Sequence, residues 1–251
     1  MTTALLGPPI TPPAQLDAAL CTRGHAVLDA PGVASLIGAP DTRELDALSS
    51  LWDDLPPDNY LRDGGRYRRR RHGCFVVLER GAVEPVRHRA HWQPLDYNAL
   101  HGGIERWFEP LAEAMTRAPV WPRLLAALAA RASALRGEQH WYVEAHPFRI
   151  DTTDGIGRPT PEGAHRDGVD LVAVMLVDRR GVKGGETRVF DAAGPTGIRF
   201  TMSEPWTLLL LDDARVIHET TPIQPLDPAT PGSHRDTLVV TCRAGSFQGP
   251  G

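Results

Sequence analysis

Apolar residues recur at helical spacing in several stretches of the first half of the chain. Two of these stretches, "IERWFEPLAEAMTRA" and "WPRLLAALAARASALRG", predict helices, and Gly137 ends the second. "QLDAALCTRG" predicts a short helix that Gly24 closes, and the following "HAVLD" predicts a strand. In "DTRELDALSSLWDDLPP", Asp41 as N-cap and Glu44 further along form a capping box, and the double proline ends the helix. Residues 1–137 are therefore expected to be mostly helical, with early strands.

The chain after Gly137 has a different pattern, in which short apolar runs are separated by turn residues. Breaks such as "RRGVKGG", "AAGPTG" and "LDPATPG" supply the glycine and proline that tight turns require. Strands that are this short and this closely spaced favour an antiparallel sandwich or barrel over βαβ units. The predicted strands are 140–150, 169–178, 186–191, 198–203, 206–212, 215–221 and 235–243.

The combined pattern predicts a mainly β fold with flanking helices. The expected core is a double-stranded β-helix, the cupin-like jelly roll, with helices packed on one outer face. We expect a single domain over residues 1–251, in which residues 138–245 form the jelly-roll core. A chain of this length is sufficient for one domain with a sizeable buried core.

Composition and charge narrow the range of partners. A net charge of −4 gives no overall positive field to attract nucleic acid or an anionic membrane. The longest apolar runs, "LVAVMLV" and "WTLLLL", are far shorter than the roughly 20 residues that a spanning helix needs. Separated cysteines without a CxxC pair argue against a disulfide framework and a thiolate zinc site. No secretory signal is evident in the proline-interrupted start, so a cytoplasmic location is expected, without nucleic acid or membrane partners.

The segment "EGAHRDGVD" places His165 and Asp167 two residues apart, directly ahead of "LVAVMLV". Alone, it also fits a polar turn that leads into a buried strand. In extended backbone these two side chains point to one side, and a jelly roll could bring His218 of "LLLLDDARVIHETTPI" opposite them. Two imidazoles and one carboxylate form the facial triad of non-haem Fe(II) oxygenases, which leaves coordination positions open. A structural zinc site would instead need four closed ligands.

A second motif, "HRDTLVVT", offers a cation beside such a site. An open Fe(II) site needs a reductant, and a 2-oxo acid that chelates the metal can serve if its distal carboxylate is held. Arg235 opens this strand and Thr237 lies on the same face, so a guanidinium fork and a hydroxyl could grip that carboxylate together. The alternative interpretation of Arg235 is a surface arginine at the end of a strand.

"HRDGVDLVAVMLVDRRGVKGGETRVFD", "LLLLDDARVIHETTPI" and "HRDTLVVT" together resemble the Fe(II)/2-oxoglutarate-dependent dioxygenases. Specifically, they resemble the family that includes the bacterial L-isoleucine dioxygenases, which hydroxylate free amino acids. The resemblance implies that the metal site lies in the jelly-roll core, with His165, Asp167 and His218 binding Fe(II). It also implies that Arg235, with Thr237, holds the C5 carboxylate of 2-oxoglutarate.

The activity that this resemblance implies is hydroxylation of an unactivated C–H of a small substrate, most simply a free L-amino acid. The co-substrates would be O2 and 2-oxoglutarate, with release of succinate and CO2. The retained Asp167 favours hydroxylation, because halogenating relatives have a small residue at this position. One alternative is an oxygenase for a carrier-bound amino acid, a peptide or another natural-product intermediate, which a wide mouth over His165 would favour. Another is a non-catalytic metal-binding jelly roll, and a homodimer is compatible with the sequence.

Tyr67, Tyr142 and His146 are the candidates for substrate contact. In "WYVEAHPFRI", strand alternation places Tyr142 and His146 on the face opposite Arg149, which favours His146 near the site. The basic run "RYRRRRH" at 66–72 fits a solvated face or a set of ion pairs better than a nucleic-acid site. A third interpretation is that one of its arginines, or Tyr67, holds a substrate carboxylate. "KGGET" is assigned to a structural turn.

Overall fold

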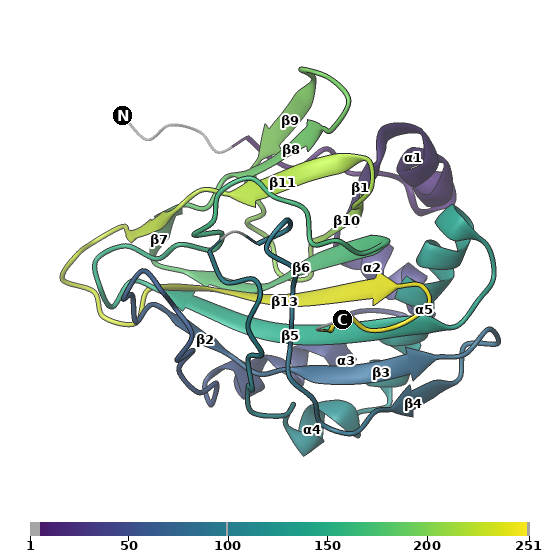
Figure 1. The fold of residues 1–251 in the computed structure, drawn as a ribbon. Coiled ribbons are helices and arrows are strands. Elements are labelled where there is room, and N and C mark those ends of the chain that lie inside the picture. Colours follow the sequence, from purple (N-terminus) through teal and green to yellow (C-terminus); the bar gives the residue numbers. More distant parts are fainter. Residues whose placement is uncertain (1–5, 99, 250–251) are drawn as a thin grey trace.

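The computed structural model describes residues 6–98 and 100–249, and its largest element is an eight-stranded antiparallel sheet (Figure 1). The strand order is β1-β10-β6-β13-β5-β3-β4, and β2 also pairs with β5. The strands of this sheet are β1 (His25–Leu28), β2 (Arg68–Arg70), β3 (Gly73–Val77), β4 (Val83–Pro85), β5 (Trp141–Asp151), β6 (Leu171–Arg180), β10 (Leu208–Asp212) and β13 (His234–Arg243).

Shorter strands complete the jelly roll. One small sheet has the order β11-β8-β9, and the other pairs β12 with β7. Their bounds are β7 (Val182–Gly184), β8 (Thr187–Asp191), β9 (Gly197–Phe200), β11 (Val216–Thr220) and β12 (Ile223–Pro225). Figure 1 shows β8, β9 and β11 near β1 and β10, and apolar side chains from these strands share one buried cluster. The predicted mainly β fold with a jelly-roll core is confirmed.

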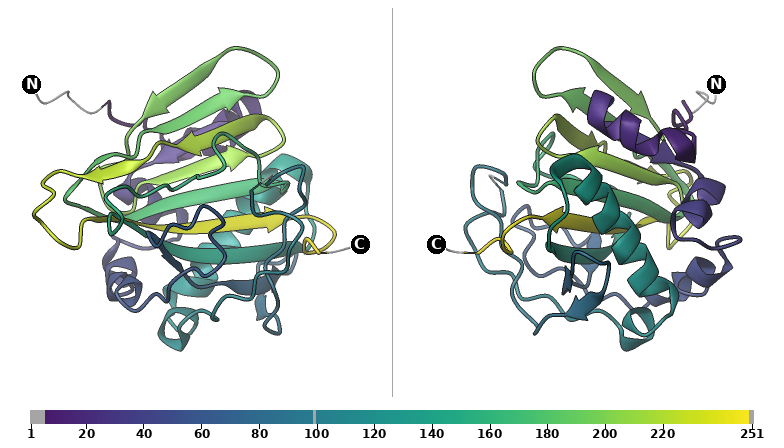
Figure 2. Two further views of the ribbon diagram at one scale, coloured as in Figure 1. Left: turned by 60° about the vertical axis from the view of Figure 1, so that its left-hand side comes forward. Right: turned by 90° about the vertical axis from the view of Figure 1, so that its right-hand side faces the viewer.

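Residues of the long strands alternate between two environments, as the period of two requires. In β5, Trp141 and Val143 belong to the large apolar core, whereas Glu144 and His146 line a cavity on the other face. Helix α5 (Val120–Arg136) packs its apolar side chains into that same core and crosses one face of the sheet (Figure 2, right). The helices therefore cover one face of the large sheet, and the cavity lies on the other.

The helices are α1 (Leu16–Arg23), α2 (Ala30–Leu36), α3 (Arg43–Asp46), α4 (Glu113–Thr116) and α5, with 3-10 turns η1 (Pro13–Gln15) and η2 (Ser49–Trp52). The predictions for α1 and α5 are confirmed, including their ends at Gly24 and Gly137, which have positive φ angles of 74° and 88°. The sequence analysis missed α2, where Asp29 caps the helix by accepting a hydrogen bond from the Gly32 N–H at 2.9 Å.

Two predicted helices are wrong in extent. "DTRELDALSSLWDDLPP" forms only α3 and η2, and Asp41 is not the N-cap but accepts a hydrogen bond from the Arg43 N–H just ahead of α3. The break lets the Trp52 indole donate to the carbonyls of Phe148 and Thr237, both at 3.1 Å. Such long-range contacts override local helix propensity.

"IERWFEPLAEAMTRA" is helical only in α4. Its first part is extended, because Arg106 and His91 exchange backbone hydrogen bonds at 2.9 Å. Pro110, which lacks an N–H, also disfavours a continuous helix there. This extended segment carries the Arg106 side chain into the cavity.

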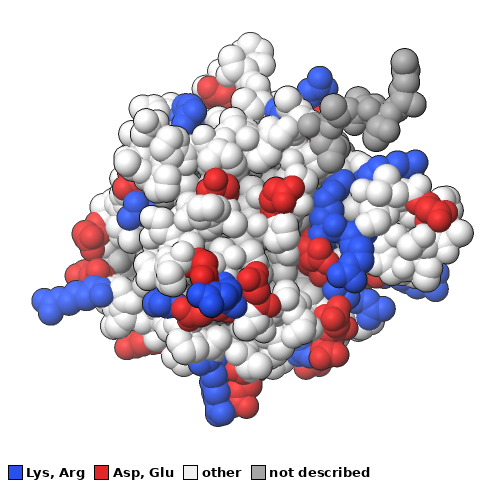
Figure 3. Space-filling model, turned by 180° about the vertical axis from the view of Figure 1, so that it is seen from behind, with Lys and Arg blue, Asp and Glu red and all other residues white. Residues whose placement is uncertain are grey.

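The surface carries charge of both signs. Seen from behind, Lys and Arg side chains are interspersed with Asp and Glu side chains (Figure 3). Ion pairs such as Arg131 with Asp17 at 2.8 Å join helices across the surface. Within the described residues, no helix is both long and apolar enough to cross a membrane. The single-domain prediction for 1–251 includes residues 1–5, 99, 250 and 251, which lie outside the described residues.

Candidate metal and substrate site

A cavity of about 130 Å³ lies against the large sheet on the face away from the helices. Alternate residues of β13, including Thr237 and Val239, form its floor together with His146 and Phe148 of β5. β2, β11, the loop after β4 and the loop ahead of β6 supply most of the remaining walls. The cavity thus gathers side chains that are far apart in the sequence.

His165, Asp167 and His218 meet at one end of this cavity. His165 and His218 form an isolated β-bridge, in which each backbone N–H donates to the other's carbonyl at 3.0 Å. Asp167 Oδ1 is 3.8 Å from His165 Nε2, and Asp167 Oδ2 is 3.7 Å from His218 Nε2. These separations exceed hydrogen-bond length. The three donor atoms, all within 4.8 Å of one another, could therefore surround a metal ion.

The orientation of His165 suits a metal ligand. Its Nδ1 lies 2.9 Å from the Gly163 carbonyl and can donate a proton there, which leaves the Nε2 lone pair for a metal. Burial acts to lower the pKa of His165, but the carboxylates of Asp167 and Glu162 outweigh it and raise that pKa. Burial, with His165 nearby, holds the pKa of His218 well below its usual value. A neutral His218 imidazole is the form that ligates metals.

Asp213 holds the loop that carries His165 and Asp167. Its carboxylate accepts hydrogen bonds from the N–H groups of Asp167, Gly168 and Val169 at 2.8 to 3.1 Å. Burial raises the pKa of Asp213 to about 7, and the Asp167 charge adds to this effect. Gln93 donates to Asp167 Oδ1 at 3.1 Å and so orients the carboxylate itself. Sequence reasoning missed both residues, although Asp213 directly follows a predicted strand.

Arg235 lies in the same cavity with unused hydrogen-bond donors. Its side chain is buried, and its Nε and Nη2 have no hydrogen-bond partner within the described residues. Burial, with Arg179 nearby, lowers its pKa to about 10. Thr237 lines the cavity two residues further along β13. An unpartnered buried guanidinium is costly, so this position fits a ligand carboxylate.

Glycines of "KGGET" shape the wall behind Arg235. Gly185 has a φ of +67°, and a Cβ there would lie 2.8 Å from Arg179 and 3.7 Å from Arg235 Cδ. A larger residue would displace the Arg179 guanidinium and reach ordinary contact with the Arg235 side chain. The segment therefore has a structural role beside the site.

The basic run at 66–72 is used within the fold. Arg68 and Arg70, alternate residues of β2, line the cavity, in line with the suggestion that one of these arginines enters the site. The other arginines have partners outside the cavity: Arg66 with Asp154 at 2.8 Å, Arg69 with Asp151 at 3.6 Å, and Arg71 with the Pro110 carbonyl at 3.0 Å.

The three candidate substrate residues differ in position. His146 lines the cavity. Tyr67 does not: it is buried beside Ile150, and its hydroxyl donates to Asp63 at 2.6 Å. Burial raises the pKa of Tyr67, and the bond to Asp63 adds to the shift. Tyr142 also lies outside the cavity lining and packs edge-on against another ring, with centroids 5.0 Å apart.

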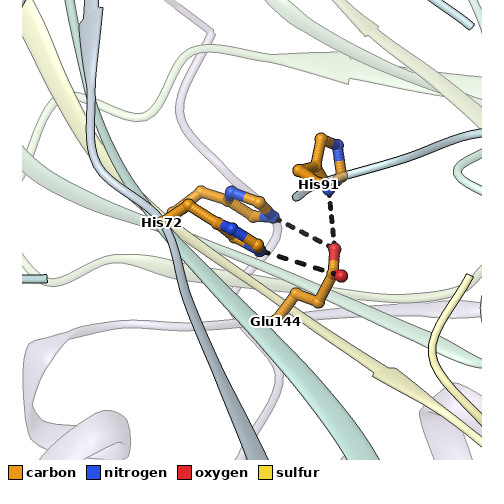
Figure 4. A group of neighbouring side chains, drawn as sticks. His72, His91 and Glu144 are labelled. Atoms are coloured by element: carbon orange, nitrogen blue, oxygen red, sulfur yellow. Dashed lines mark hydrogen bonds and ion pairs between the residues drawn. The ribbon is translucent and has the colours of Figure 1, made fainter. Parts of the chain in front are cut away.

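A second group of titratable side chains lies at the opposite wall, formed by His72, His91, Glu144 and His146. His72 and His91 point toward the Glu144 carboxylate (Figure 4). The His91 Nδ1 atom is 2.7 Å from Glu144 Oε2, and His72 Nε2 is 3.7 Å from Oε1. Sequence reasoning did not find this group, because Glu144 and His146 lie on β5 whereas His72 and His91 come from two other segments far away in the sequence.

Residues 49–241 match the family model described as 2OG-Fe dioxygenase. A solved bsmA homolog from Methylobium petroleophilum PM1 is 55% identical, with 96% of this chain and 97% of that chain covered and a TM-score of 0.91. No protein of curated function matches the chain.

Two more distant structures support the fold alone. IDO from Bacillus thuringiensis is 14% identical, with 98% of this chain and 100% of that chain covered and a TM-score of 0.74. The Fe(II)/(alpha)ketoglutarate-dependent dioxygenase TqaL is 19% identical, with 94% of this chain and 91% of that chain covered and a TM-score of 0.66.

The family match extends over most of the chain, and the 55%-identical structure aligns along nearly all of it. The donor set of two imidazoles and one carboxylate fits Fe(II), and the unpartnered Arg235 fits a dicarboxylate co-substrate. The chain therefore belongs to the 2OG-Fe dioxygenase family and is an enzyme that uses Fe(II), 2-oxoglutarate and O2.

Proposed function

We propose that this enzyme hydroxylates an unactivated C–H of a free L-amino acid, as its resemblance to the isoleucine dioxygenase family suggests. His165, Asp167 and His218 would hold Fe(II), and Arg235 with Thr237 would bind the C5 carboxylate of 2-oxoglutarate. One observation carries the proposal: a single cavity joins the three donor side chains to the unpartnered Arg235. The chain is proposed to form one domain, since α5 and the large sheet share one core.

Bound iron would supply oxygen activation coupled to decarboxylation of 2-oxoglutarate, with one oxygen atom entering succinate and the other the substrate. The residues of the chain position the reactants. Arg235 would neutralise the distal carboxylate in a buried environment, and Gln93 keeps Asp167 oriented through its 3.1 Å hydrogen bond. Val174 and Val239 give the cavity apolar walls that limit water near the reacting carbon.

Limited exposure of the site favours a small substrate over a carrier-bound one. Within the described residues, the His165 side chain is 11% exposed and that of His218 is 10% exposed, so the donor set is mostly covered. The cavity wall also contains charges of both signs, including Arg70 and Glu162, and Glu162 Oε2 is buried without a partner. A zwitterionic amino acid has both a carboxylate and an ammonium to meet such groups.

Anaerobic titration of the enzyme with Fe(II) and 2-oxoglutarate tests this proposal through the visible metal-to-ligand charge-transfer band. We expect a band that requires both additions, and about 10- to 100-fold weaker 2-oxoglutarate binding in Arg235→Ala. Arg243→Ala, also on β13 but bonded to Ser246 outside the cavity, is the matched control. A panel of free L-amino acids is then screened for succinate release, with pantetheine-linked amino acids as the alternative substrates. An iron-loaded enzyme without the band would contradict the cofactor assignment.

A further inference from the structure

The wall of the cavity that β2 and β5 form contains a group of side chains that the proposed chemistry does not use. His72, His91, Glu144 and His146 have donor atoms within 4.8 Å of one another, and all four are buried. His72 and His146 are stacked with ring centroids 4.7 Å apart. Such a group could be a second metal centre or a hydrogen-bond network.

Protonation distinguishes these possibilities. Arg70 Nη2 lies 2.6 Å from His146 Nδ1, and a guanidinium can only donate hydrogen bonds. His146 Nδ1 is therefore an acceptor, and the proton of the neutral ring is on Nε2, the atom 3.7 Å from Glu144 Oε2. A protonated nitrogen has no lone pair for a metal. His91 Nδ1, at 2.7 Å from the same oxygen, is likewise a donor to Glu144.

The charges of this group agree with a hydrogen-bond network. Burial lowers the pKa of His91 to about 3 and holds that of His146 well below its usual range, so both rings are neutral. Burial opposes ionisation of Glu144, but the surrounding imidazoles outweigh it and keep the pKa of this carboxyl low. Glu144 is thus a carboxylate that accepts a hydrogen bond from the neutral His91 imidazole, and His146 accepts one from Arg70.

Arg70 itself lacks an anionic partner. Its guanidinium lies between the rings of Phe108 and Phe148, with centroids at 3.9 and 4.3 Å, and is almost fully buried. Of the five N–H donors of a guanidinium, only the one bonded to His146 has a partner within the described residues. The buried Nε has none. Aromatic faces attract a cation but do not accept its in-plane hydrogen bonds.

The neighbouring guanidinium groups differ in whether a carboxylate contacts them directly. Arg68 is paired with Asp58 at 2.7 Å, whereas Arg106 donates to the neutral Gln93 at 2.8 Å and has an unpartnered Nε. The guanidinium groups of Arg68, Arg70 and Arg106 lie near the carboxylates of Asp58, Glu144 and Glu162, but only Arg68 has a direct ion pair with one of them, Asp58. Arg70 and Arg106 therefore keep N–H donors that a ligand carboxylate could accept from.

This position is separate from the proposed 2-oxoglutarate site. β5 lies between β2 and β13, and Phe148 pairs with Arg70 on one side and with Thr237 on the other. Two strand spacings, about 10 Å, therefore separate the backbones of Arg70 and Thr237. One carboxylate of 2-oxoglutarate at Arg235 would leave Arg70 available to another molecule.

We propose that Arg70, assisted by Arg106, binds the carboxylate of the substrate, and that Glu144 with its three histidines is a positioning group for Arg70. This inference rests on the proposed function, and it names the group that the enzyme recognises. The substrate would be a carboxylic acid that projects from Arg70 toward the donor set of His165, Asp167 and His218.

The test compares L-amino acids and short 2-hydroxy acids with their carboxamides on the anaerobic Fe(II)- and 2-oxoglutarate-loaded enzyme. Binding is followed by perturbation of the charge-transfer band, and turnover by succinate release in air. We expect at least one acid to bind about 100-fold more tightly than its carboxamide, and Arg70→Met to remove most of that preference. Arg70→Met should leave the affinity for 2-oxoglutarate within about twofold, which separates this result from a loss of fold or cofactor.

Two variants make the test specific. Arg69→Met, on the opposite face of β2 and paired with Asp151, is the matched control and should keep the preference for acids. Glu144→Gln should raise KM for the acid with a smaller effect on kcat, and should reduce the acid-to-carboxamide ratio, because Glu144 acts on Arg70 through its charge and through His146 rather than by direct contact.

Three results would overturn the inference while leaving the cofactor assignment intact. The first is equal binding of acids and carboxamides, and the second is an unchanged ratio in Arg70→Met. The third is a normal charge-transfer band that no carboxylate of the panel perturbs. A second equivalent of Zn2+ that binds the wild type but not Glu144→Gln would instead establish a metal centre.

Discussion

The cavity contains two groups in which imidazoles surround a carboxylate, and they differ in how the ring nitrogens are used. In the group of His165, Asp167 and His218, the carboxylate lies 3.7 to 3.8 Å from Nε2 atoms that carry no hydrogen bond to it. Around Glu144, His72 and His146 lie at a similar 3.7 Å, but His91 approaches to 2.7 Å. The first spacing leaves room for an ion, and the second is a hydrogen bond already made.

The partners of the second nitrogen explain this difference. His165 Nδ1 faces the Gly163 carbonyl, an acceptor, so Nε2 retains its lone pair. His146 Nδ1 faces Arg70, a donor, so Nε2 is protonated. Similar residue types therefore give a candidate iron site in one place and an arginine-positioning network in the other.

The largest expected effect is the loss of Fe(II) binding when one imidazole is removed from the group of His165, Asp167 and His218. Removal of one imidazole from the group around Glu144 is the comparison. His218→Ala should lose tight Fe(II) binding and reduce succinate formation by about 1,000-fold or more, because two donors cannot hold the ion. His72→Ala should retain one Fe(II) per chain. Iron content after gel filtration and single-turnover succinate release measure both effects. Full iron loading of His218→Ala would contradict the ligand assignment.

The next largest effect should be on Fe(II) affinity, when the loop that carries His165 and Asp167 loses its support from Asp213. Asp213→Ala removes the acceptor of three backbone N–H groups and should weaken Fe(II) binding by about 10- to 100-fold. Titration of the apoenzyme with Fe(II) measures this change, and a melting curve checks the fold. Unchanged iron affinity would show that the loop keeps its geometry without Asp213.

A smaller effect concerns the pH dependence of stability. His91 has a folded pKa of about 3, below the ordinary value of 6.5, so between these values the unfolded state binds the extra proton. Stability should therefore fall as pH drops below 6.5, by about 1.4 kcal/mol per pH unit from this residue. Urea unfolding between pH 7.5 and 5 should give a shallower slope for His91→Gln than for the wild type. Equal slopes would contradict a neutral, buried His91.

The smallest effect should come from Tyr67, which precedes the arginines of β2 but lies outside the cavity lining. Tyr67→Phe removes the hydrogen bond to Asp63 and should cost about 1 kcal/mol of stability. Substrate-dependent succinate formation should not change. Tyr142→Phe, at another position outside the cavity, is the control, and a raised KM in Tyr67→Phe would indicate that its hydroxyl reaches the substrate.

The sequence alone was sufficient for the jelly-roll core, because strand alternation and turn residues are local signals. The same local rule predicted that His146 lies on the face opposite Arg149; His146 lines the cavity, and Arg149 pairs with Asp236 away from it. The motifs "HRDGVD" and "HRDTLVVT" pointed to His165, Asp167 and Arg235, whose ligand roles stay predictions.

Only the tertiary structure decided how the remaining cavity wall is built. Nothing local distinguishes Arg70 from Arg69, and pairing of β2 with β5 decides which one enters the cavity. Backbone pairing of His91 with Arg106 converts a predicted helix into an extended wall segment. These contacts join residues far apart in the sequence, and their energies depend on packing and burial that no local pattern contains.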